Sequence, residues 1–110
     1  MAFRFEGLEI WHLARGYATH IYAITARFPK HERFWPADQM NRAANSVVLN
    51  IAEGSGQDTF AQFNRYLGIA TGSVCKVVSG IFLALDRGYI DEGDRLIRKI
   101  TNFCKTCDKR

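Results

Sequence analysis

Polar side chains that could do chemistry recur at spacings of three and four residues between positions 39 and 53. They are Gln39, Arg42, Ser46, Asn50 and Glu53. At these spacings all five share one face of an α-helix. A carboxylate on the same face as a guanidinium, an amide and a hydroxyl could form an active site or bind a polar ligand. The same arrangement could also be a structural hydrogen-bond network, or simply a solvated helix face.

The neighbouring residues favour the structural interpretation of this polar face. Ser and Asn are poor helix formers, which argues against a fully exposed surface. The apolar arc beside them is wide, so we expect partial burial, and a buried Arg42 or Glu53 would need a polar partner. Lys76, in the middle of the next predicted helix, is the expected partner of Glu53. We therefore predict a structural polar lock that fixes helix register. Its members are Gln39, Arg42, Ser46, Asn50, Glu53 and Lys76.

Other motifs that carry chemistry are incomplete in this sequence. Cys104 and Cys107 have the spacing of redox and zinc sites, but they fall in the last turns of a predicted helix. A redox pair would sit at a helix start after a strand, and a zinc site would need a second pair of ligands. The Gly-Ser-Gly turn at residues 54–56 lacks the lysine of a phosphate loop. The sequence therefore predicts a non-enzymatic protein with no catalytic residue, no cofactor and no metal site.

The composition is that of a single globular domain. The chain has 110 residues, of which 47% are hydrophobic and 24% charged, so one modest core spanning residues 1–110 is expected. The N-terminal segment has no apolar stretch typical of a secretory signal. Three cysteines cannot all pair within one chain. We therefore expect a cytoplasmic protein in a reducing compartment.

The period of the apolar residues predicts four helices, at roughly residues 8–28, 36–54, 60–88 and 94–107. Pro29 is expected to stop the first, Pro36 to stand in the first turn of the second, and Gly54 to end it in a left-handed conformation. Gly88 is expected to end the third. Short connections between four helices predict an all-α, antiparallel up-down-up-down four-helix bundle.

The third predicted helix is the most apolar. Its twenty residues from Tyr66 to Leu85 contain one charge, Lys76, so a membrane span is an alternative. A central lysine costs about 2.5–3.5 kcal/mol in a membrane helix, and the other helices are amphipathic and need this one as their core. We expect no membrane contact. A stripe of small residues, Gly68, Gly72, Cys75 and Ser79, is expected to let another helix backbone approach closely.

The last predicted helix concentrates the positive charge of the chain. Residues 95–110 contain six basic residues and one acid, a net charge of +5, whereas the whole chain carries +4. Basic residues often complement the dipole at a helix C-terminus, but six exceed that need. We predict a surface that binds the phosphates of RNA or DNA without sequence preference. Its residues are Arg95, Arg98, Lys99, Lys105, Lys109 and Arg110.

The segments "QMNRAANSVVLNIAEGSG", "FNRYLGIATGSVCKV" and "GYI" resemble a bacterial family of four-helix bundles. That family was first noticed as proteins encoded by intervening sequences within 23S rRNA genes. The resemblance places Asn50, Glu53, Gly54, Gly72 and Ser73 at the family's characteristic positions. At position 76 the family usually has Glu where this chain has Lys.

The resemblance also implies an assembly and partners. It implies a homopentamer whose fold is similar to the accessory variability proteins of diversity-generating retroelements, which are associated with a reverse transcriptase and its RNA or DNA. Two hypotheses follow: a non-enzymatic oligomer that binds structured RNA or DNA through its last helix, or a protein–protein adaptor that docks a reverse transcriptase. A third is an enzyme with a site around Arg42, Asn50 and Glu53.

Overall fold

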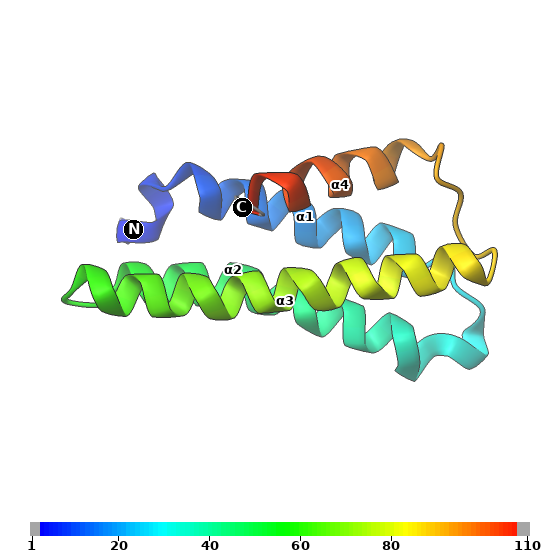
Figure 1. The fold of residues 1–110 in the computed structure, drawn as a ribbon, viewed down its shortest axis with the longest axis horizontal. Coiled ribbons are helices and arrows are strands. Elements are labelled where there is room, and N and C mark those ends of the chain that lie inside the picture. The colour runs from blue at the N-terminus through cyan, green and yellow to red at the C-terminus, as the bar shows by residue number, and fades with distance from the viewer. Residues whose placement is uncertain (1–2, 108–110) are drawn as a thin grey trace.

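A computed structural model describes residues 3–107, without the side chains of residues 106 and 107. Within that range the chain is all helical, with no strands, and the predicted four α-helices are confirmed. They are α1 (Glu9–Thr25), α2 (Asp38–Ser55), α3 (Phe60–Asp86) and α4 (Arg95–Cys107). Short helical turns η1 (Arg4–Gly7), η2 (Lys30–Glu32) and η3 (Arg33–Ala37) precede α1 and α2. Consecutive helices run in opposite directions, with α1 and α4 above α2 and α3 in Figure 1.

The core is built from the apolar stripe of each helix. Fully or almost fully buried side chains are Ile21 and Ile24 of α1, Val47 and Ile51 of α2, Val77 of α3 and Ile100 of α4. Along α3 the apolar residues that recur every three or four positions are buried from Ala70 to Ala84, whereas Phe60, the first residue of the helix, is 77% exposed. The first turns of α3 extend beyond the end of α4 (Figure 1), so α4 does not cover them.

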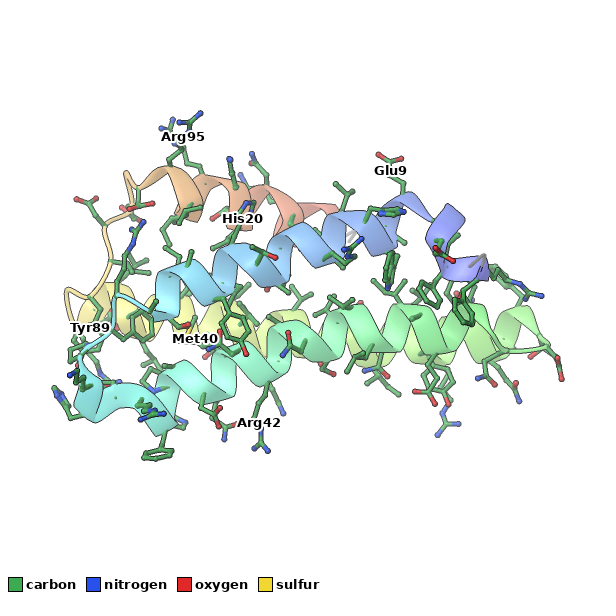
Figure 2. The ribbon with its side chains drawn as sticks, turned by 180° about the vertical axis from the view of Figure 1, so that it is seen from behind. Glu9, His20, Met40, Arg42, Tyr89 and Arg95 are labelled. Carbon is green, nitrogen blue, oxygen red and sulfur yellow. The ribbon has the colours of Figure 1, made fainter. Side chains whose placement is uncertain are left out.

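The α2–α3 hairpin is held close at both ends by glycines. A Cβ on Gly54 would lie 2.8 Å from Tyr66 Cβ and 2.9 Å from Phe63 Cδ1. At the other end, a Cβ on Gly80 would lie 2.6 Å from Met40 Cγ. Figure 2 shows Met40 directed into the bundle. The two helices therefore approach too closely at Gly54 for a larger residue, and at Gly80 a larger residue would require the Met40 side chain to move.

This packing corrects two expectations about small residues. Gly54 does not end α2 in a left-handed conformation, because α2 continues through it to Ser55. The expected close-packing stripe of α3 is also wrong within the chain, since Gly68 and Gly72 have open space beside them and Cys75 and Ser79 are exposed.

The helix ends are fixed by local contacts. Gly88, with φ of 73°, follows α3 as predicted. Pro36 stands two residues before the start of α2 at Asp38, directly after Trp35, whose extended backbone interrupts η3. At the C-terminal end of α2, the Ser55 carbonyl accepts a hydrogen bond of 3.0 Å from Arg4 Nη1.

The helix α4 packs mainly on α1. Phe103 stacks on Tyr17 with ring centroids 4.3 Å apart, and Ile100 is completely buried. Asp94 Oδ1 accepts a 2.8 Å hydrogen bond from the backbone N–H of Leu96, which caps the helix start. The Asp94 carboxylate also forms an ion pair with Arg27 at the end of α1. On its other side α4 leaves an open groove toward α3.

By length and composition alone, α3 is long and apolar enough to cross a membrane. Its most apolar line, Val74, Val77 and Ile81, packs into the core instead. Core helices of helical bundles pass the same compositional test, so α3 carries no membrane assignment here.

Candidate nucleic-acid interface

The outer face of α4 carries four exposed cations. Arg95, Arg98, Lys99 and Lys105 are all exposed, and Figure 2 shows Arg95 directed away from the bundle. The helix contains no acidic residue, and none of the four cations has an ion-pair partner among residues 3–107. Their charge is therefore available to a polyanion. Lys109 and Arg110, also predicted for this surface, lie outside the described residues.

The geometry of α4 sets the reach of this surface. A helix rises about 1.5 Å per residue, so Arg95 and Lys105, ten positions apart, are separated by about 15 Å along the axis. Each strand of a duplex carries one phosphate per about 3.4 Å of axis. The four cations can therefore contact several phosphates along one edge of a duplex. The apolar face of α4 is buried against α1, which keeps the cations fixed on the outside.

Acidic residues border the start of this basic face. Asp91 and Glu92 are exposed in the connection that leads into α4. Asp94 is neutralised by Arg27, and hydrogen bonds from Arg27 and from the Leu96 backbone lower the pKa of its carboxyl. The positive surface therefore begins at Arg95 and extends toward the C-terminus.

His20 of α1 lies next to the basic face. Burial, followed by the positive charge of Lys99, holds the pKa of His20 below its ordinary value of 6.5. The sequence suggested no relation between His20 and Lys99, because they are 79 positions apart and belong to different helices. An anion bound at Lys99 would offset this charge, so His20 can report on occupancy of the basic face.

We expect the His20 imidazole to titrate in a pH series followed by NMR with a midpoint below 6.5. The folded protein holds this proton less tightly than the unfolded chain. The free energy of unfolding therefore has its highest value, as far as His20 is concerned, above about pH 6.5. It falls as the pH drops from there through the pKa of His20 in the folded protein. Replacing Lys99 with Ala should raise the midpoint. A midpoint at or above 6.5 in the unmodified protein would contradict this arrangement.

The polar face of α2 is only partly brought together. Asn50 Nδ2 donates to the Ser46 carbonyl at 2.8 Å and to Ser46 Oγ at 2.9 Å. Ser73 Oγ of α3 donates to Ser46 Oγ at 2.9 Å. These three half-buried residues form one hydrogen-bonded cluster between α2 and α3. Ser73 was missed by spacing along one helix, because it comes from the neighbouring helix.

The other predicted members of the lock are exposed. Arg42 points away from the bundle (Figure 2) and lies 3.9 Å from Asp38, one turn earlier on the same helix. Gln39 and Lys76 face solvent. Glu53 is exposed as well, and its Oε1 accepts a long 3.5 Å hydrogen bond from the Tyr66 hydroxyl.

The expected ion pair between Glu53 and Lys76 is wrong. The contacts of Tyr66 with Glu53 and of Ser73 with Ser46 set the register of the two antiparallel helices. Lys76 lies ten residues beyond Tyr66 along α3, a distance of about 15 Å. It therefore lies near the start of α2, far from Glu53.

We expect Ser46 and Ser73 to be energetically coupled. A double-mutant cycle of Ser46→Ala and Ser73→Ala, followed by chemical unfolding, should give a coupling energy of about 0.5–1.5 kcal/mol. The reason is that their direct hydrogen bond joins two helices in a half-buried position. Strictly additive effects would show that this cluster does not hold the helix register.

No arrangement in the described part of the chain suggests a metal centre, since no three His, Cys, Asp or Glu side chains gather there. Cys75 is an exposed free thiol. Cys104 is half-buried with its Sγ 3.9 Å from the Tyr17 hydroxyl, and the Cys107 side chain lies outside the described residues. Of the three residues considered as a possible active site, Asn50 is hydrogen-bonded to Ser46, whereas Arg42 and Glu53 are exposed and contact Asp38 and Tyr66 respectively.

A groove of about 1180 Å³ separates α3 from α4. Apolar side chains line it, including Val78 and Phe82 of α3 and Ile97 of α4, while Arg98 and Lys105 stand at the α4 side. Phe82 is 61% exposed. The sequence did not reveal this groove, because helix periodicity predicts an apolar face but not which neighbour covers it.

The fold and the charged helix together define a class of protein. It is a small all-α protein of four antiparallel helices, in which the last helix presents an uninterrupted basic face. The sequence profile of the family described as 23S rRNA-intervening sequence protein matches residues 6–109, and the chain belongs to this family. The resemblance seen in the sequence is thereby confirmed. A search of curated proteins found no match to the chain.

Proposed function

We propose that the protein is a non-enzymatic, cytoplasmic oligomer that binds structured RNA through α4. The observation that carries this proposal is the row of four exposed cations, which have no ion-pair partner among residues 3–107, on a helix without acids. The family description refers to an intervening sequence of 23S rRNA and names no ligand; we take RNA as the first nucleic acid to test. Contacts to phosphates do not depend on base sequence, so a folded RNA of regular helical shape is a suitable target.

The oligomeric part of the proposal is supported by the surface of the chain. The chain exposes 7226 Å², whereas a compact monomer of this mass exposes about 6,200 Å². The excess of about 1,000 Å² is comparable with what one protein contributes to a standard interface. The open α3–α4 groove and the exposed, nearly uncharged face of α3 supply apolar surface for such contacts. The resemblance to the family implies a pentamer.

Two measurements test the proposal separately. Native mass spectrometry gives the number of chains, and a single mass of one chain at micromolar concentration would contradict the oligomer. Gel-shift titrations with an RNA hairpin and a DNA hairpin of matched sequence test the ligand. We expect both to bind at low salt and the RNA to bind more tightly, whereas no binding of either would reject nucleic-acid binding.

The second candidate is an adaptor that docks another protein, such as a reverse transcriptase. The observation that favours it is the apolar α3–α4 groove, which the described chain leaves uncovered. A gene for a reverse transcriptase with a template repeat beside the gene of this protein would support the adaptor. Location inside an rRNA operon would support the RNA-binding proposal instead.

A further inference from the structure

The connection between α1 and α2 presents two aromatic side chains to solvent. Phe34 is 78% exposed and Trp35 is 51% exposed, both in η3. The neighbouring Pro36 and Ala37 are buried, so the backbone is anchored while the rings project outward. We call Lys30, Arg33, Phe34, Trp35 and Arg87 the aromatic corner.

A contact with Arg87, the residue that follows α3, holds part of the aromatic corner in place. The Arg87 guanidinium lies 5.3 Å from the centroid of the Trp35 ring. The same guanidinium donates through Nη1 to Glu32 Oε2 at 3.1 Å. Arg33 lies 6.0 Å from the centroid of Phe34. The Trp35 ring is therefore positioned by a guanidinium that is itself held by Glu32, which lowers the entropy cost of binding a further flat group to this ring.

The aromatic corner also carries free positive charge. Lys30 and Arg33 are exposed and have no ion-pair partner within residues 3–107. The nearby acid, Glu32, is 17% exposed and already engaged by Arg87, with His31 Nε2 at 3.8 Å from its other oxygen. A ligand that approaches the rings therefore meets cations around them.

We propose that the aromatic corner binds unpaired nucleotides of a single-stranded RNA segment. Bases stack on Phe34 and Trp35, and the adjoining phosphates contact Lys30 and Arg33. Exposed aromatic rings surrounded by Arg and Lys are the usual platform for unpaired bases. A membrane surface fits less well, because only two rings project and charged side chains surround them.

This inference deepens the proposed function, and it rests on RNA being the ligand class. The aromatic corner lies at the bundle end where α4 begins, but on the α2 side (Figure 1). Arg95 of α4 points outward from the opposite layer (Figure 2). A structured RNA with an unpaired loop or tail could thus contact α4 by its duplex and the corner by its unpaired bases.

The test uses a single-stranded oligouridylate as the probe, with tryptophan fluorescence and anisotropy as readouts. The full chain should show quenching on titration, and Phe34→Ala should weaken binding about tenfold. Phe60→Ala is the matched control, because Phe60 is 77% exposed but lies at the other end of the molecule. Trp35→Phe keeps a ring and should retain affinity while losing the quenching.

Three results would overturn the proposal. One is the absence of quenching by the oligouridylate in the unmodified chain. Another is equal affinity of Phe34→Ala and Phe60→Ala for the probe. The third is a change in oligomeric mass with Phe34→Ala, which would make the aromatic corner a contact between copies.

The outcome is separable from that for α4. Removing the four α4 cations should abolish binding of a blunt-ended RNA duplex, which has no unpaired bases, while leaving oligouridylate quenching in place. Phe34→Ala should do the reverse. If the unmodified protein binds only one of the two probes, the proposal for the surface expected to bind the other probe is wrong.

Discussion

Replacing Arg95, Arg98, Lys99 and Lys105 together with Ala lowers the affinity for an RNA hairpin by two to three orders of magnitude at about 0.15 M salt. Each cation that contacts a phosphate releases a condensed counterion, so the loss of four contacts removes about four such contributions. The side chains are exposed and make no ion pair within the described chain, so the fold should survive. Fluorescence anisotropy with a labelled hairpin measures the change.

A charge-matched control separates position from net charge. The variant with Arg15, Arg42, Arg65 and Lys76 replaced by Ala removes the same number of exposed cations from the other three helices. We expect a decrease in affinity of less than tenfold, because distant charges are screened beyond about 8–10 Å at this ionic strength. Equal losses in the two variants would mean that net charge, rather than α4, attracts the RNA.

Replacing Gly54 with Val destabilises the protein by about 2–3 kcal/mol, which lowers the melting temperature by about 10 °C or more. Even a single Cβ at this position would stand 2.8 Å from Tyr66 Cβ, which is rigidly attached to the α3 backbone. The two helices must therefore separate, and the burial around Phe63 is lost with them. Thermal unfolding followed by circular dichroism at a fixed protein concentration measures the effect.

Gly68→Ala provides the matched control for this prediction. Gly68 lies inside α3, and a Cβ added there would have nothing within 4 Å of it, so Ala should stabilise the helix by about 0.5–1 kcal/mol. If Gly54→Val were as stable as the unmodified protein, the close approach of α2 and α3 at Gly54 would be wrong.

The fold could be predicted because each helix carries a clear apolar period. In α3, the residues from Ala70 to Ala84 that recur at three and four positions are the ones found buried. The role of Gly54 in the close packing of α2 against α3 could not be predicted in the same way. Its role depends on Tyr66 and Phe63 in the facing helix, and a glycine near a predicted helix end is more often a cap.

The candidate sites show the same division. The cations of α4 were visible because they follow one another on a single helix, and their exposure agrees with the apolar face opposite. The predicted polar lock included too many residues. Ser46 and Asn50 form a hydrogen-bonded cluster with Ser73, whereas Arg42 and Glu53 face solvent. Pairing of side chains across two helices depends on their register. The expected Glu53–Lys76 pair assumed a register that differs from the observed one by about 15 Å. The α3–α4 groove and the aromatic corner likewise depend on which faces remain uncovered.

The most direct test of the account is the salt dependence of RNA binding by the unmodified protein. Titrations of an RNA hairpin between about 50 and 200 mM salt give the slope of log K against log salt. If several α4 cations contact phosphates, the slope is about −3 or steeper, and it flattens in the variant that lacks the four α4 cations. A slope near zero, or the same slope in both proteins, would contradict RNA binding through α4.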